Sequence, residues 1–110
     1  QVRDVLFIED LCDAYLLAFK NLKKTGGQIF NIGGGAKNQM SLLELLAFLG
    51  RFLGKPIATD FGAWRPGDQP VFVCDISKAQ RVFGWKPKVG VEAGVKKLHA
   101  WVMENRALFK

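Results

Sequence analysis

The residues with the most evident capacity for chemistry lie in one turn, Trp64–Gln69. Pro66 fixes φ near about −65° and Gly67 permits a positive φ, so the pair predicts a tight turn. Arg65 offers a planar fork of N–H donors that suits carboxylate or phosphate oxygens. Asp68 could hold that fork or accept a hydrogen bond from a ligand hydroxyl. Taken alone, the six residues favour the plainer interpretation of a surface turn with a local ion pair.

A second arginine, Arg3, lies close to the start of the sequence. Two guanidinium groups could together bind an anion, although either arginine taken singly is more simply solvated surface. Arg3 and Arg65 are far apart along the chain, so this interpretation requires a fold that brings them together.

The composition is that of a globular domain, with 110 residues, 49% of them apolar and 24% charged. No apolar run approaches the length of about 18 residues that a membrane span needs. The net charge of +6 is compatible with an anionic partner, either nucleic acid or a phosphorylated small molecule. No recognised nucleic-acid-binding motif occurs around the lysines, and we interpret most of these side chains as solvated. Gln1, in place of an initiator methionine, suggests a piece of a longer protein.

Cysteine and histidine give little sign of a metal site. Cys12 and Cys74 lie in apolar segments and are expected to be buried, reduced thiols, with a disulfide as the minor alternative. His99 cannot hold a metal alone and is expected to face solvent on a terminal helix.

Apolar periodicity predicts a single unit of alternating strands and helices. Asp10 is the expected N-cap of a first helix, which should end at residues 26–27. Ser41 and Glu44 have the spacing of a capping box, and we assign the leucine-rich face of the helix that follows to the core. The remaining expected elements are a strand or extended segment at 5–8, a strand at 28–32, a short helix from 75 to 84 and a final helix carrying 91–102.

A glycine cluster, Gly33–Gly35, follows the expected strand 28–32. A dinucleotide-binding loop has a third glycine at the position of Asn38 and opens a helix directly, and neither feature is present here. The cluster therefore indicates tight turning or close backbone approach.

A complete catalytic arrangement is missing from this sequence. Tyr15 has Phe19 four residues later, so there is no Tyr-x-x-x-Lys pair. Ser41 is assigned to a cap, and the paired carboxylates Glu9 and Asp10 are explained by a helix start. We expect no catalytic residue and no metal ligand in this chain.

The sequence carries an ordered series of motifs: Val2–Val5, Glu9–Asp10, Asp13–Ala14, Phe30–Gly35, Ser41–Leu45, Arg65–Asp68, Asp75–Ala79 and Phe83–Pro87. Together these motifs are more specific than any one of them. They resemble the C-terminal third of the NAD-dependent nucleotide-sugar epimerase/dehydratase family, the extended short-chain dehydrogenases. Within that family the chain looks most like CDP-paratose/CDP-tyvelose 2-epimerases, with UDP-glucose 4-epimerases close behind.

The resemblance implies a mixed α/β substrate-binding domain with short strands and about four helices. Residues 1–33 would complete the Rossmann sheet of the longer protein. That protein would bind NAD in an N-terminal Rossmann domain, which would also hold the Tyr/Lys pair. Its chemistry would be hydride transfer between a sugar carbon and NAD, and this chain alone would be inactive.

The resemblance also implies the site residues and partners. Arg3 and Arg65 would neutralise the diphosphate of a nucleotide-diphosphate sugar, Asp68 would contact its ribose, and Phe72 would lie on the nucleotide side. Many 4-epimerases have Tyr where Val5 stands here. The parent would be a cytoplasmic homo-oligomer without nucleic-acid or membrane partners.

Three alternatives remain. The parent could be a nucleotide-sugar dehydratase. The chain could instead be a stand-alone basic module for nucleotides or nucleic acid, as the +6 charge suggests. It could also be a structural fragment with no ligand of its own.

Overall fold

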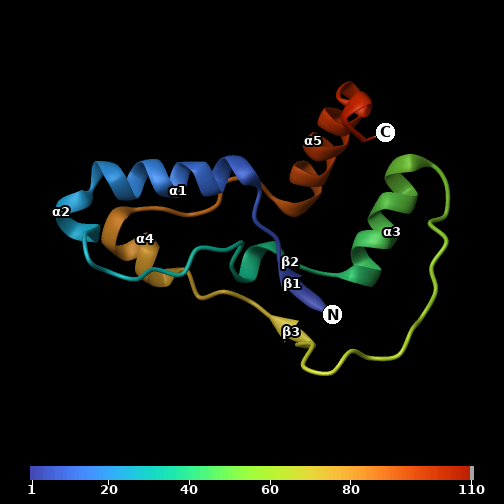
Figure 1. The fold of residues 1–110 in the computed structure, drawn as a ribbon, viewed down its shortest axis with the longest axis horizontal. Coiled ribbons are helices and arrows are strands. Elements are labelled where there is room, and N and C mark those ends of the chain that lie inside the picture. Colours follow the sequence, from blue (N-terminus) through green and yellow to red (C-terminus); the bar gives the residue numbers. More distant parts are fainter. Residues whose placement is uncertain (110) are drawn as a thin grey trace.

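A three-stranded sheet joins two groups of helices in the computed structural model, which describes residues 1–109 (Figure 1). Helices α1, α2 and α4 extend to one side of this sheet, and α3 and α5 lie on the other. The elements are β1 (Val2–Asp4), α1 (Ile8–Lys20), α2 (Leu22–Thr25), the 3-10 helix η1 (Ala36–Asn38), β2 (Gln39–Ser41), α3 (Leu42–Leu53), β3 (Val71–Phe72), α4 (Ser77–Phe83), α5 (Val91–Glu104) and the 3-10 helix η2 (Arg106–Phe109). None of the helices described is long and apolar enough to cross a membrane.

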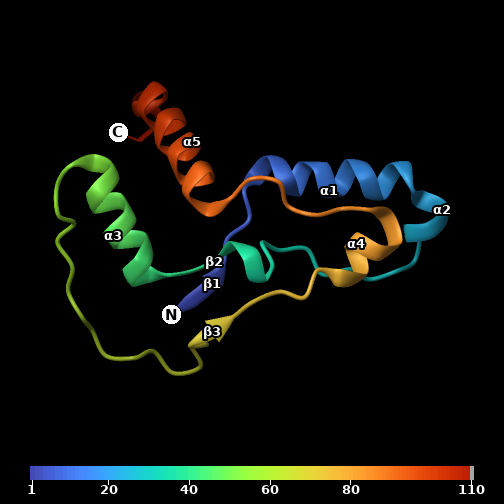
Figure 2. The same cartoon turned by 180° about the vertical axis from the view of Figure 1, so that it is seen from behind.

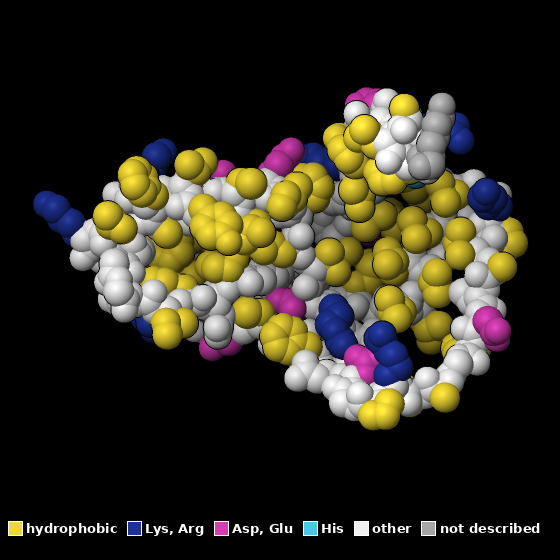
Figure 3. All heavy atoms as spheres, in the orientation of Figure 1, with side chains coloured by type: hydrophobic (Ala, Val, Ile, Leu, Met, Phe, Trp, Pro, Cys, Tyr) yellow, Lys and Arg dark blue, Asp and Glu magenta, His cyan; other side chains and the backbone are white. Residues whose placement is uncertain are grey.

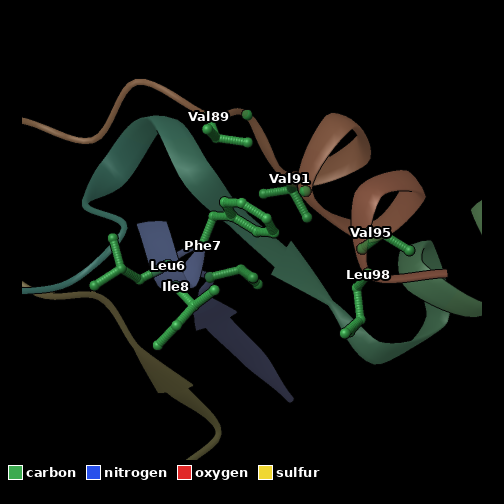
Figure 4. A pocket seen from close by; sticks show the side chains of 10 residues that line it. Leu6, Phe7, Ile8, Val89, Val91, Val95 and Leu98 are labelled. Carbon is green, nitrogen blue, oxygen red and sulfur yellow. The ribbon is translucent and has the colours of Figure 1, made fainter. Parts of the chain in front are cut away.

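The central strand of the sheet is β1, in the order β2-β1-β3. It pairs antiparallel with β2 and parallel with β3, so Arg3 lies opposite Met40 on one side and Phe72 on the other. The expectation of a strand at residues 5–8 is therefore wrong, although an extended entry segment describes residues 5–7. The partner strands pair with residues 2–4, and the apolar side chains that follow line a pocket against α5 (Figure 4).

Asp10 does not cap α1, contrary to the prediction. The helix begins at Ile8, with its N-cap at Phe7, three residues before the predicted one, and it has no side-chain cap. The Asp10 carboxylate is buried and accepts hydrogen bonds from the backbone N–H groups of Lys88, at 3.1 Å, and Val89, at 2.9 Å. The carboxylate therefore bonds to residues far along the chain and not to the first turn of its own helix. A capping rule that considers only neighbouring residues does not predict such partners.

The hydrophobic core lies between α1 and α4 and is centred on Trp85, which is almost fully buried. Ala14 of α1 and Ala79 and Phe83 of α4 complete the buried cluster. Phe30 meets Phe83 edge-to-face, with ring centroids 5.0 Å apart. The prediction that α4 ends at Gly84 is confirmed, since this residue adopts φ +74°.

The capping box at the start of α3 is confirmed, with Ser41 and Glu44 each bonding the other's backbone N–H. The assignment of the leucine face to the core holds only in part: Leu45, Leu46 and Leu49 are half-buried, Leu42 is exposed, and the buried residue of α3 is Phe48. Helix α5 approaches this face at His99, whose ring meets Phe52 edge-to-face at 5.2 Å. His99 is consequently half-buried and does not face solvent as predicted.

Residues 28–32 form no strand, contrary to the prediction. A strand needs a neighbour to take its backbone hydrogen bonds, and no described strand lies beside this segment. Ile29 is 86% exposed. Cys12 is also exposed, against expectation, and Cys74 is half-buried; both are free thiols. The apolar pattern around Cys12 reflects a helix whose outer face is uncovered.

The chain is expanded for its length. Its radius of gyration is 16.7 Å, against about 13 Å for a packed domain of this size. A long connection without helix or strand runs from the end of α3 to β3 (Figure 2). Apolar side chains cover much of the surface along α1 and in the hollow between α3 and α5 (Figure 3). The exposed large hydrophobic residues include Ile8, Tyr15, Leu16, Phe19, Leu22, Phe61 and Trp64.

Candidate anion-binding site

Two separate segments position the arginines. Arg3 lies in β1 at the centre of the sheet. Arg65 opens the predicted turn, which is present: Gly67 has φ +78°, and the backbone N–H of Asp68 donates to the Arg65 carbonyl oxygen at 3.2 Å. The Val2 N–H donates to the Pro70 carbonyl oxygen at 2.8 Å, which holds the end of the turn against β1. The turn is therefore held next to the central strand.

The two guanidinium groups meet at one carboxylate. Nη2 of Arg3 lies 3.3 Å from Oδ1 of Asp68, and Nη2 of Arg65 lies 3.1 Å from Oδ2. The side-chain amide of Gln1 also donates to Oδ2. The convergence of Arg3 and Arg65 that a shared diphosphate site requires is thus present in the fold.

The electrostatics of the cluster favour a further anion. Two arginines and one aspartate leave a net charge of +1, and the Arg65 side chain is 80% exposed. The hydrogen bond from Arg65 lowers the pKa of Asp68, and the positive charges of Arg65 and Arg3 and the bond from Gln1 act in the same direction against the opposing effect of burial. Asp68 is therefore ionised at neutral pH, and the exposed guanidinium donors remain available to a ligand.

Phe72 lies beside this cluster, directly opposite Arg3 in the parallel register of β1 and β3. Its side chain is about half exposed, and that of Trp64 is more so. Of the four residues expected at the site, Arg3, Arg65 and Asp68 are in contact, and Phe72 is the neighbour of Arg3 across the sheet. The sequence analysis did not anticipate Gln1, because a lone glutamine next to a strand carries no pattern that indicates a contact.

The glycine cluster packs against β1. A Cβ added to Gly33 would lie 2.5 Å from Oδ2 of Asp4, and one added to Gly34 would overlap the Val5 backbone. Oδ2 of Asp4 also accepts a hydrogen bond from the Gly35 N–H at 3.0 Å. Close backbone approach, as predicted, is the reason for these glycines. Atoms of Asp4, Val5 and Cys74 therefore fill the space that side chains at Gly33 and Gly34 would need.

The sequence model of the GDP-mannose 4,6 dehydratase family matches residues 1–98. The chain belongs to this family. The resemblance to NAD-dependent nucleotide-sugar epimerases and dehydratases is thereby confirmed, and so is the mixed α/β fold.

Several nucleotide-sugar epimerases are similar to the chain. It is 42% identical over 108 residues to a CDP-paratose 2-epimerase of Salmonella typhi, covering 92% of this chain and 30% of that protein. It is 34% identical over 110 residues to a UDP-glucuronate 4-epimerase of Thermodesulfobacterium geofontis, covering 100% of this chain and 33% of that one. The chain therefore spans about a third of the length of the curated relatives it matches.

A solved structure shares the fold of this family member. The UDP-glucose 4-epimerase of Bifidobacterium longum, crystallised with NAD+ and UDP, superposes with a TM-score of 0.78 at 28% identity. The match covers 96% of this chain and 31% of that one.

Proposed function

We propose that this chain is the nucleotide-diphosphate-sugar-binding part of an NAD-dependent nucleotide-sugar epimerase. The observation that carries the proposal is the meeting of Arg3 and Arg65, from two distant segments, at one point on the protein surface. Two guanidinium forks at one point suit a ligand with several anionic oxygens. The similarity to CDP-paratose and UDP-hexose epimerases supports a ligand of this class.

Each residue of the cluster has a role in this proposal. Arg3 and Arg65 bind the diphosphate oxygens. Asp68 accepts a hydrogen bond from a ribose hydroxyl, and Phe72 offers an apolar surface on the nucleotide side. We favour a CDP-linked sugar and a CDP-tyvelose 2-epimerase-like activity, because the relative at 42% identity is a CDP-paratose 2-epimerase. UDP-glucose 4-epimerase or dehydratase activity is the alternative. The similarity to UDP-glucose 4-epimerases supports the first of these.

The longer protein supplies what this chain lacks. The glycine loop lacks the third glycine of the dinucleotide-binding pattern, so we place NAD and the catalytic residues in the part of the protein that this chain does not span. Residues 1–33 would then pack against the Rossmann sheet of that part, which would give the unpaired segment 28–32 a neighbouring strand. The uncovered face of α1, with Tyr15 and Phe19, fits the same arrangement. We expect the enzyme to be a cytoplasmic homo-oligomer.

Isothermal titration of the full-length protein with CDP-glucose and UDP-glucose tests this function. We expect binding of at least one of them, and the preferred base identifies the ligand class. A stand-alone nucleic-acid-binding module, suggested by the net charge of +6, would instead bind generic DNA with an affinity that falls steeply with salt. Failure to bind either nucleotide sugar would overturn the proposal.

A further inference from the structure

We propose that Asp68 is an internal substitute for the ligand's anion, occupying the place between Arg3 and Arg65 until a diphosphate takes it. The inference rests on the proposed function, because it assumes that an anionic ligand binds these two arginines. It assigns to Asp68 a positioning role in the free protein, in addition to a contact with the bound ligand.

The geometry of the carboxylate carries this step. Each of its oxygens meets a different guanidinium, Oδ1 that of Arg3 and Oδ2 that of Arg65. Two oxygens bound to one carboxyl carbon each accept from a separate arginine. A phosphate group would bridge Arg3 and Arg65 in the same way. The carboxylate thus holds both forks at a spacing that an anion can use.

The exposure of the three side chains indicates which arginine can exchange Asp68 for a ligand anion first. The side chain of Asp68 is 14% exposed, that of Arg3 is 40% exposed and that of Arg65 is 80% exposed. Arg3 is also tied back through Nη1, which donates to the Val2 carbonyl oxygen at 2.8 Å. An arriving anion therefore meets Arg65 first. Arg3 and Gln1 still hold the carboxylate when Arg65 turns to the ligand.

The two possible roles of Asp68 predict opposite effects of removing its charge. Without a negative group between them the two guanidinium groups repel each other, so Asp68 stabilises the empty site. The same carboxylate competes with, and repels, an incoming anion. A residue that merely supported the arginines would weaken anion binding when neutralised, whereas a substitute for the anion would strengthen it.

The test is the affinity of the full-length protein for inorganic pyrophosphate, measured by calorimetry at fixed pH and ionic strength. Asp68→Asn should lower Kd by about two- to tenfold, the scale of one or two exposed ion pairs. Asp60→Asn is the matched control: it removes the same charge from the same connection, where the Asp60 carboxylate accepts from the Phe61 N–H, and should leave Kd unchanged. An equal or larger Kd for Asp68→Asn, or no detectable binding to either protein, would overturn the inference.

A measurement on the unmodified protein covers the case in which Asp68→Asn does not fold. The carboxyl carbon resonance of Asp68, followed by NMR over a pH titration, reports the pKa that Arg3, Arg65 and Gln1 hold down. Saturating pyrophosphate should raise that pKa, because the ligand takes the guanidinium donors. An unchanged pKa would contradict the displacement.

The two proposals fail separately. If pyrophosphate behaves as expected but neither nucleotide sugar binds, the proposed function fails and the role of Asp68 remains. If a nucleotide sugar binds and Asp68→Asn does not tighten pyrophosphate binding, the role of Asp68 alone is lost.

Discussion

The indole N–H of Trp85 donates a 2.9 Å hydrogen bond to the carbonyl oxygen of Asp10, a residue 75 positions earlier in the chain. The Asp10 carboxylate receives the backbone N–H groups of Lys88 and Val89 in return. This pair ties the start of α1 to the connection between α4 and α5, and it closes the core around the most buried large side chain of the described residues.

We expect Asp10→Ala to lower the free energy of unfolding by about 2–4 kcal/mol, because it leaves two backbone donors without their acceptor in a largely buried place. Urea denaturation of the full-length protein measures the change. Glu9→Ala is the control: Glu9 is exposed and pairs with Lys97 at the surface, so its loss should cost less than about 1 kcal/mol. Equal effects of the two substitutions would contradict the role of Asp10.

Gly34→Ala tests the packing of the glycine cluster on β1. The added methyl group would overlap the Val5 backbone, so the loop and the strand must separate. Overpacking of this kind costs about 1–3 kcal/mol or more, and thermal unfolding should show the loss. Gly62→Ala, where an added Cβ meets nothing within 4 Å, should change stability by less than about 0.5 kcal/mol. A fully stable Gly34→Ala protein would show that the close approach is not required.

The capping carboxylate of α3 gives a pH dependence. The backbone N–H and hydroxyl of Ser41 lower the pKa of Glu44 below its ordinary value of 4.5. A lowered folded-state pKa contributes stability that is present above the unfolded value and is lost as the pH falls through the folded one. Between about pH 5 and pH 3, wild-type stability should therefore fall more steeply than that of Glu44→Gln. Parallel profiles in urea denaturation would contradict this assignment.

Arg65→Ala should weaken nucleotide-sugar binding by about 1.5–3 kcal/mol, the scale of a hydrogen bond to a charged group. Calorimetric titration of the full-length protein measures the loss. Arg51→Ala removes an equal charge from the exposed last turn of α3 and should leave the affinity unchanged. Unaltered affinity in Arg65→Ala would remove this residue from the site.

The uncovered apolar face of α1 should make the 110-residue chain self-associate at high concentration. Tyr15 and Phe19 are 70% and 75% exposed, and apolar patches of this kind drive association when nothing covers them. Light scattering should detect oligomers that the double substitution Tyr15→Ser and Phe19→Ser reduces. A monodisperse monomer at millimolar concentration would contradict the expectation.

Local patterns determined the features that depend on neighbouring residues. The Pro66–Gly67 turn, the Ser41–Glu44 capping box and the glycine end of α4 follow from backbone preferences and from hydrogen bonds within a few positions. The family could also be identified from the order of the motifs, because an ordered series is far more specific than any single turn.

Tertiary structure decided the features that depend on distant partners. The sequence assigned Asp10 to a cap, the leucines of α3 to a core and residues 28–32 to a strand, because each pattern is locally sound. In the fold, the Asp10 carboxylate accepts from the backbone of Lys88 and Val89, the leucines of α3 are exposed or half-buried, and residues 28–32 pair with no described strand. Burial and strand pairing are properties of whatever packs on a segment, so no local pattern can determine them.

The sequence supplied Arg3, Arg65 and Asp68 as separate charges of suitable chemistry. Their meeting was decided by the parallel pairing of β1 with β3, which carries the turn to the central strand. A charge acts through distance in space, and the sequence alone does not fix that distance between residues far apart along the chain.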